Sequence, residues 1–173
     1  MLPDPLHPAV VHFPIVLLLL GAPLAAVAVF FRGHHLPLLA AIVLLLGAGG
    51  AVVATVTGES DAEMAGELAE NGESILEEHE EWGERARNFG LIAAVLAIAS
   101  ATLVRQPVAG RIVGSVAAAA AIAAALAVAQ AGHYGGQVVY KFGVGVITAA
   151  ASAAGGGGAP APEQGKNRKH DDD

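Results

Sequence analysis

The side chains with the widest chemistry in this sequence are its seven histidines, because the chain contains no cysteine. Without cysteine there is no disulfide, no thiolate nucleophile and no zinc–thiolate or iron–sulfur site, so a metal must be bound by His, Met or oxygen ligands. His12 is the most informative histidine, since it lies in an otherwise uncharged apolar run, where an imidazole needs a partner or a polar pocket. Pro14 follows it and frees a backbone carbonyl one turn earlier. We therefore take His12 as a candidate site residue.

Three further histidines are expected on the same membrane face. His7 precedes the first apolar run, His79 has apolar-face spacing within an acidic segment, and His133 follows the last apolar run. Inward histidines on opposing helices fit axial ligation of haem b, or binding of a copper, zinc or iron ion. A non-haem ion needs three or four ligands, and Glu59 and Glu78 are carboxylates that can join the histidines. The candidate cofactor ligands are His12, His79, His133 and His7, and the candidate metal ligands are these four with Glu59 and Glu78.

Four long apolar runs must position these residues. They cover residues 9–31, 36–56, 89–104 and 112–131, and none contains Asp, Glu, Lys or Arg. Crossing a hydrocarbon core takes about 20 helical residues, so three runs qualify directly. The run at 89–104 qualifies if its helix extends back past Arg87 and Arg85. With 54% apolar and 14% charged residues, the sequence excludes an ordinary soluble enzyme.

Short connections between the runs predict an all-α fold, an integral membrane four-helix up-and-down bundle. An acidic amphipathic helix is expected between the second and third spans, because apolar residues recur there at steps of three, four or seven. Asn71-Gly72 interrupts it, and its second half runs from about Glu73 into the third span. The predicted transmembrane domain is 1–151, with helices at about 8–31, 36–57, 82–104 and 110–132.

The remaining segments are predicted to lie outside the spans. Residues 135–151 are apolar but short and Gly-rich, so we expect them at the interface or folded back against the bundle. Residues 152–173 form a Gly/Ala/Pro and charged tail that is predicted to be disordered. His34, His35 and His170 are interpreted as turn and tail residues.

Charge suggests an orientation and excludes one class of partner. The net charge is −7, and 11 of the 16 acidic residues lie between Glu59 and Glu84, so we expect no nucleic-acid partner. Basic residues near the membrane are equally numerous on both faces: Arg32, Arg105 and Arg111 at the tight turns, and Arg85, Arg87 and Lys141 on the other face. Nearby acids can neutralise Arg85 and Arg87, which favours the turns inside a bacterial cytoplasmic membrane and both termini outside.

Four motifs in the sequence point to a family. They are LHPAVVHFPI at Leu6–Ile15, TGE at Thr57–Glu59, His79-Glu80, and GGQVVYKFGVGV at Gly135–Val146. Over roughly residues 6–147 the chain resembles the DUF2231 family of bacterial membrane proteins. The resemblance implies a four-span membrane protein whose relatives are in some cases joined to cytochrome-like or other redox domains outside the cytoplasm. It implies no activity.

The leading hypothesis is a small membrane redox or electron-transfer module. In it His12 and either His79 or His133 ligate haem b or a metal ion near the outer face, and the acidic segment docks a soluble cytochrome, or quinone is the partner. The alternative is a cofactor-free structural or assembly subunit of a larger membrane complex, whose histidines make interhelical hydrogen bonds. A small-solute permease is less favoured, because midplane depth lacks charged residues. No enzyme reaction is assigned.

Overall fold

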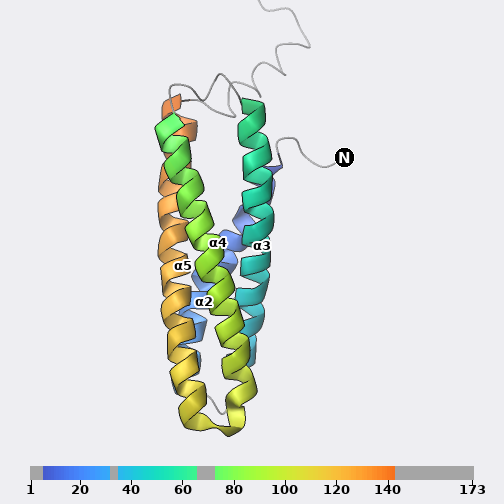
Figure 1. Ribbon diagram of the computed structural model, residues 1–173, viewed down its shortest axis with the longest axis vertical. Coiled ribbons are helices and arrows are strands. Elements are labelled where there is room, and N and C mark those ends of the chain that lie inside the picture. Colours follow the sequence, from blue (N-terminus) through green and yellow to red (C-terminus); the bar gives the residue numbers. More distant parts are fainter. Residues whose placement is uncertain (1–5, 32–34, 66–72, 143–173) are drawn as a thin grey trace, which may run out of the picture.

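The computed structural model describes residues 6–31, 35–65 and 73–142, and all regular elements in these ranges are helical. In chain order they are α1 (His7–Val10), α2 (His12–Phe30), α3 (Leu36–Ala65), α4 (Glu73–Thr102), the 3-10 helix η2 (Leu103–Arg105) and α5 (Pro107–Phe142). Four long helices lie side by side, and the chain reverses direction from each to the next (Figure 1). The predicted all-α class is confirmed, and the arrangement fits the predicted four-helix bundle.

Small side chains fill the inside of the bundle. The long helices form a closed ring of neighbours, in which α2 contacts α3 and α5, and α4 contacts α3 and α5. Buried positions are mostly alanine, and Leu18 and Leu44 are the largest fully buried side chains among the described residues. The exposed surface, in contrast, carries many Leu, Ile, Val and Phe side chains. This distribution suits lipid, where helices associate through close packing of small residues rather than through burial of large ones.

Three segments are long and apolar enough to cross a membrane: His7–Phe30, Leu36–Asp61 and Pro107–Lys141. Helix α4 is not among them, because its first half carries most of the acidic segment together with Arg85 and Arg87. It is nevertheless one continuous helix across these charges. The apolar run at 89–104 therefore has the backward extension that a fourth span requires, and the fourth span itself stays a prediction.

The helix at the N-terminus is interrupted at one residue. Val11 separates α1 from α2 but keeps right-handed helical angles, with φ −59° and ψ −29°. Pro14 is the physical reason, since it has no N–H to donate to the carbonyl of Val10. The break is slight, and His7–Phe30 still acts as one candidate span.

Helix α3 is longer than predicted, since it continues past residue 57 to Ala65, whereas α4 runs from Glu73 into the third apolar run as the sequence predicted. The acidic residues in the described ranges therefore lie on extensions of these two helices. A separate acidic amphipathic helix between the second and third spans is not confirmed in the described ranges, and residues 66–72 lie outside them.

The expectation for residues 135–151 needs correction where the structure describes them. Helix α5 continues to Phe142, so residues 135–142 extend the last helix and do not fold back against the bundle, and their position at the interface stays a prediction. Each glycine weakens a helix by up to about 1 kcal/mol, but Gly135 permits a close contact of α5 with His79 on α4. The rest of the segment and the tail at 152–173 lie outside the described residues.

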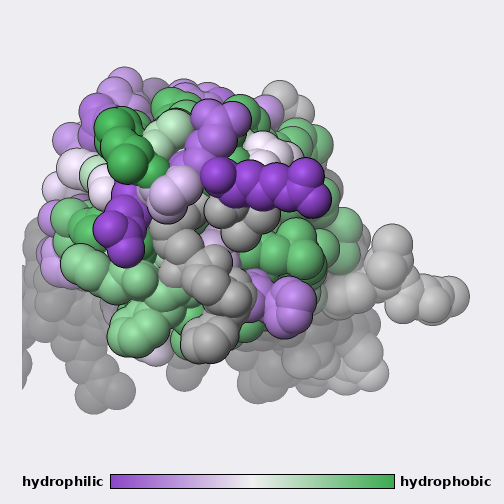
Figure 2. All heavy atoms as spheres, turned by 90° about the horizontal axis from the view of Figure 1, so that it is seen from below, coloured by the Kyte–Doolittle hydropathy of each residue, from purple (hydrophilic) through white to green (hydrophobic). Residues whose placement is uncertain are grey.

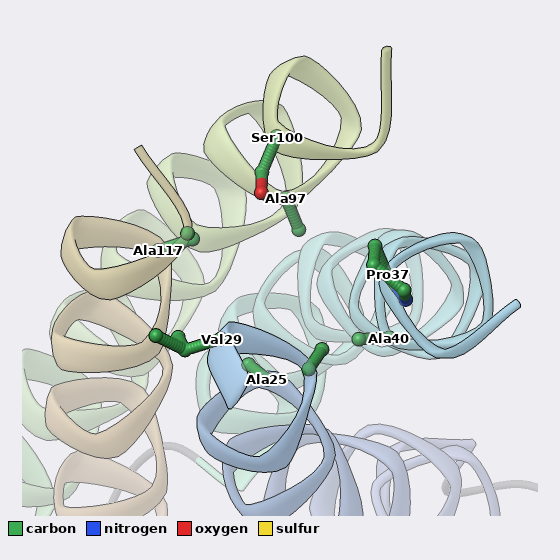
Figure 3. A pocket seen from close by; sticks show the side chains of 9 residues that line it. Ala25, Val29, Pro37, Ala40, Ala97, Ser100 and Ala117 are labelled. Atoms are coloured by element: carbon green, nitrogen blue, oxygen red, sulfur yellow. The ribbon is translucent and has the colours of Figure 1, made fainter. Parts of the chain in front are cut away.

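A very small cavity lies in the core near the tight turns. It has a volume of about 10 Å³, close to the minimum for one water molecule. Its labelled lining side chains come from α2, α3, α4 and α5 and surround a common space (Figure 3). Beside it the Ser100 hydroxyl donates a 2.9 Å hydrogen bond to the carbonyl of Gly110, which joins α4 to α5.

Candidate histidine site

His7 is attached to α3 by two hydrogen bonds. Its ring Nδ1 lies 2.8 Å from the carbonyl oxygen of Ala54. Its backbone N–H has no acceptor within the helix, because it lies at the helix start, and it donates a 2.9 Å hydrogen bond to Oδ2 of Asp61. These contacts hold the first turn of the chain against α3, and they place the half-buried imidazole between helices rather than in solvent.

His79 makes the equivalent contact on the other side of the bundle. It lies on α4, and its Nδ1 is 2.8 Å from the carbonyl oxygen of Ala131 on α5. The imidazole is half-buried, like that of His7. Each of the two histidines therefore reaches from its own helix to a backbone carbonyl of a neighbouring helix.

The two imidazoles form a pair. Their ring centres are 6.1 Å apart, and the ring planes are nearly perpendicular, at 86°. A carbonyl oxygen only accepts hydrogen bonds, so Nδ1 of each ring must carry the proton that it donates. In the neutral form the lone pair of each ring is then on Nε2. This backbone-fixed tautomer is the one that metal-ligating histidines commonly adopt.

Two glycines make room for the two rings. A Cβ atom at Gly58 would lie 3.1 Å from Nδ1 of His7, and one at Gly135 would lie 2.9 Å from Cε1 of His79. Both distances are shorter than ordinary contacts, so the rings lie directly against helix backbone. His7, Gly58, His79 and Gly135 each belong to a different one of the four sequence motifs, and the structure brings all four together.

The structure places the other two candidate histidines elsewhere. His12 is exposed, and its Nδ1 is 3.0 Å from the carbonyl oxygen of Pro8 within the same N-terminal segment. His133 is also exposed, and its ring packs edge-on against Tyr134 with ring centres 5.5 Å apart. In the described residues, neither His12 nor His133 forms a hydrogen bond or a ring contact with His7 or His79.

The candidate carboxylates do not complete a metal site with the pair in the described residues. Glu59 and Glu78 are both exposed. In the described ranges, no group of three or more His, Asp or Glu side chains lies in a position to hold a metal ion. The protein thus offers two imidazole nitrogens at this place, with acidic groups around them.

Glu80, directly after His79, has a raised pKa. Partial desolvation of its carboxyl is the largest cause, although the residue as a whole is exposed, and the negative charges of Glu59, Glu77 and Glu84 raise the pKa further, against the opposite effect of His79. Glu59 lies on α3 and the others on α4, so the ends of both helices contribute. The nearby negative charges therefore disfavour the ionised form of Glu80.

This raised pKa predicts a pH-dependent effect of Glu80→Gln. A folded-state pKa above the unfolded one gives stability that is present at low pH and is lost as pH rises through the folded pKa. The neutral amide should therefore melt at a higher temperature than wild type at pH 8, and the difference should vanish near pH 4. Thermal unfolding in detergent at both pH values measures this. Glu78→Gln, which changes another exposed carboxylate of the same helix that does not act on Glu80, is the control, and a lower melting temperature of Glu80→Gln at pH 8 would contradict the prediction.

Several residues of the site were not among those singled out from the sequence. They are Asp61, the carbonyl groups of Ala54 and Ala131, and the ring-contacting Gly58 and Gly135. A backbone carbonyl cannot be identified as an acceptor from the sequence, because every residue has one. The two glycines could have been identified, since both belong to the motifs that support the family resemblance.

Comparison with known proteins bears on the family alone. No curated protein and no solved structure is similar to this chain at a significant level. The family model described as "Predicted membrane protein (DUF2231)" matches residues 3–148, a range that includes all four motifs and every described helix. The match covers most of the chain, and the protein therefore belongs to the DUF2231 family of membrane proteins.

Proposed function

We propose that this protein is a small redox module of the membrane that binds one transition-metal ion between His7 and His79. The observation that supports the proposal is the pair of imidazoles held 6.1 Å apart with both Nδ1 atoms bound to backbone carbonyls. Two imidazoles that bind one ion through Nε2 on nearly opposite sides of it, at about 2.0–2.1 Å per bond, have ring centres roughly 6 Å apart. The pairing replaces the earlier choice of His12 with His79 or His133.

Copper is the ion that these ligands fit best. Nitrogen ligands bind Cu²⁺ more tightly than the other divalent ions of the first transition row, which matters most where the protein supplies only two of them. Water or a neighbouring carboxylate would complete the coordination. A single ion also needs no slot between closely packed, alanine-rich helices, whereas haem b needs a slot for its macrocycle.

The charged surroundings support a location on the outer face. On the face of the pair, Arg85 and Arg87 form ion pairs with Glu81 and Glu84 at 2.6 and 3.2 Å, and Lys141 donates a hydrogen bond to Gln137. The tight turns carry the exposed, basic Arg105 and Arg111. This difference favours the turns in the cytoplasm and the metal site outside, where the exposed acidic residues of α4 would attract a basic electron-carrier protein.

The test is a copper titration of the purified, metal-free protein, followed by metal analysis and by absorption and electron paramagnetic resonance spectra. We expect one copper per chain and a Cu²⁺ spectrum with nitrogen hyperfine coupling. A sharp absorption band after reduction of protein expressed with ample haem would instead identify haem b. Absence of both signals would support the alternative, a cofactor-free structural subunit.

A further inference from the structure

A groove at the opposite end of the bundle has no part in the histidine site. It lies between the start of α3 and the end of α4 and has a volume of about 320 Å³. Its floor is apolar, and its two polar residues lie at the end beside the tight turns. The apolar residues are Leu38, Ala41, Ile98 and Ala101, and the polar ones are His35 and Thr102.

The polar end of this groove lies at the level of the lipid headgroups in the membrane. His35 directly precedes the candidate span Leu36–Asp61, so the groove begins where the span leaves the hydrocarbon. The Thr102 hydroxyl donates a 2.8 Å hydrogen bond to the carbonyl of Ala99, which leaves its oxygen as an acceptor. The polar groups thus lie at interface depth, and the apolar floor extends from them toward the membrane interior.

The charge at this end is positive. Arg105 and Arg111 are exposed here, and the described residues of this end include no Asp or Glu. Thr102 precedes the 3-10 helix that Arg105 ends. Residues three apart eclipse each other in a 3-10 helix, so Arg105 lies on the side of Thr102, roughly 6 Å along the axis. Seen from this end, hydrophilic side chains lie beside exposed apolar ones (Figure 2).

We propose that this groove binds one anionic phospholipid. An acyl chain lies on the apolar floor between α3 and α4, and the phosphate lies between the imidazole of His35 and the guanidinium of Arg105. Charge complementarity selects the occupant, because basic pockets between membrane helices on the cytoplasmic side bind anionic headgroups. The proposal does not depend on the metal site, since the groove is at the other end of the helices.

The test is native mass spectrometry of the full chain released from nanodiscs that contain equal amounts of phosphatidylglycerol and phosphatidylcholine. We expect one retained lipid per chain, predominantly phosphatidylglycerol. Arg105→Gln should lower this preference about five-fold, the effect of one basic residue at a membrane surface. Ala101→Leu, which fills the floor of the groove, should remove the retained lipid.

Two comparisons make the result decisive. Arg111→Gln removes the same charge from the same end but from α5, outside the groove, and should keep the preference. Melting temperatures in phosphatidylcholine nanodiscs show whether the variants are folded. Equal retention of both lipids by wild type, an equal loss in Arg105→Gln and Arg111→Gln, or a dimer in place of a chain with lipid would each overturn the proposal.

Discussion

Replacing either His7 or His79 with asparagine is expected to abolish copper binding while the bundle stays folded. The asparagine amide can occupy the position of Nδ1 and donate to the carbonyl of Ala54 or Ala131, but it has no atom in place of Nε2. The loss of affinity should exceed the roughly 10- to 100-fold that loss of an outer-shell partner costs. Titration of the metal-free variants against a chelator of known affinity measures it.

The matched controls are His12→Asn and His133→Asn, in which an exposed imidazole is changed on the same membrane face. Both should bind copper as wild type does. Equal weakening by all four variants would refute the pairing of His7 with His79. If the histidines serve only as interhelical hydrogen-bond donors, His7→Ala and His79→Ala should lower stability by about 0.6–2 kcal/mol, and no metal should be present in any form of the protein.

Replacing Gly135 with alanine is expected to weaken copper binding by about 10- to 100-fold, although Gly135 is not a ligand. The new Cβ would lie 2.9 Å from Cε1 and 3.0 Å from Nδ1 of His79. The imidazole must therefore move away, and its hydrogen bond to Ala131 must lengthen or break. The expected result is a folded protein with a displaced ligand, measured by the same titration and by thermal unfolding.

Gly136 provides the control for this prediction. A Cβ at this neighbouring position meets nothing within 4 Å. Gly136→Ala should leave binding unchanged and stabilise the helix by about 0.5–1 kcal/mol, because alanine has the higher helix propensity. Identical copper affinities for Gly135→Ala and Gly136→Ala would show that the contact with His79 has no role in binding.

The fold could be predicted from the sequence to the level of helices and turns. Uncharged runs of about 20 residues have few alternatives to helices in lipid, and Pro and Gly between them favour turns. The residues at which the helices end were harder to predict from the sequence. The glycines near residue 135 suggested an end to the last helix, because local propensity favours a break there. Contact between Gly135 and His79 opposes that propensity, and such a contact appears only once the tertiary structure is known.

All four candidate histidines were expected on one face of the bundle, and the structure pairs His7 with His79 rather than His12 with His79 or His133. His12 lies in a run that is apolar all round, so hydrophobicity does not show which side of the helix faces inward. Residue size shows it on α4, where His79 is in helical register with the small, buried Ala86 and Gly90. His7 is in register with buried Pro14 and Leu18, whose sizes do not distinguish them from exposed residues of the same run. The residues at the same steps from His12 and His133 include exposed Leu19 and Leu126.

The alanine-rich core has a consequence for any ion at this site. Alanine has no side-chain rotamers to lose on packing and none to change afterwards, so direct contact between helix backbones sets the spacing of α3, α4 and α5. The two imidazoles are tied to these backbones through Ala54 and Ala131. An ion bound between them would find the same ligand spacing before and after it gains an electron. Such a rigid frame would keep the reorganisation energy of electron exchange low, and fixed geometry would be the basis on which the proposed site discriminates between metals.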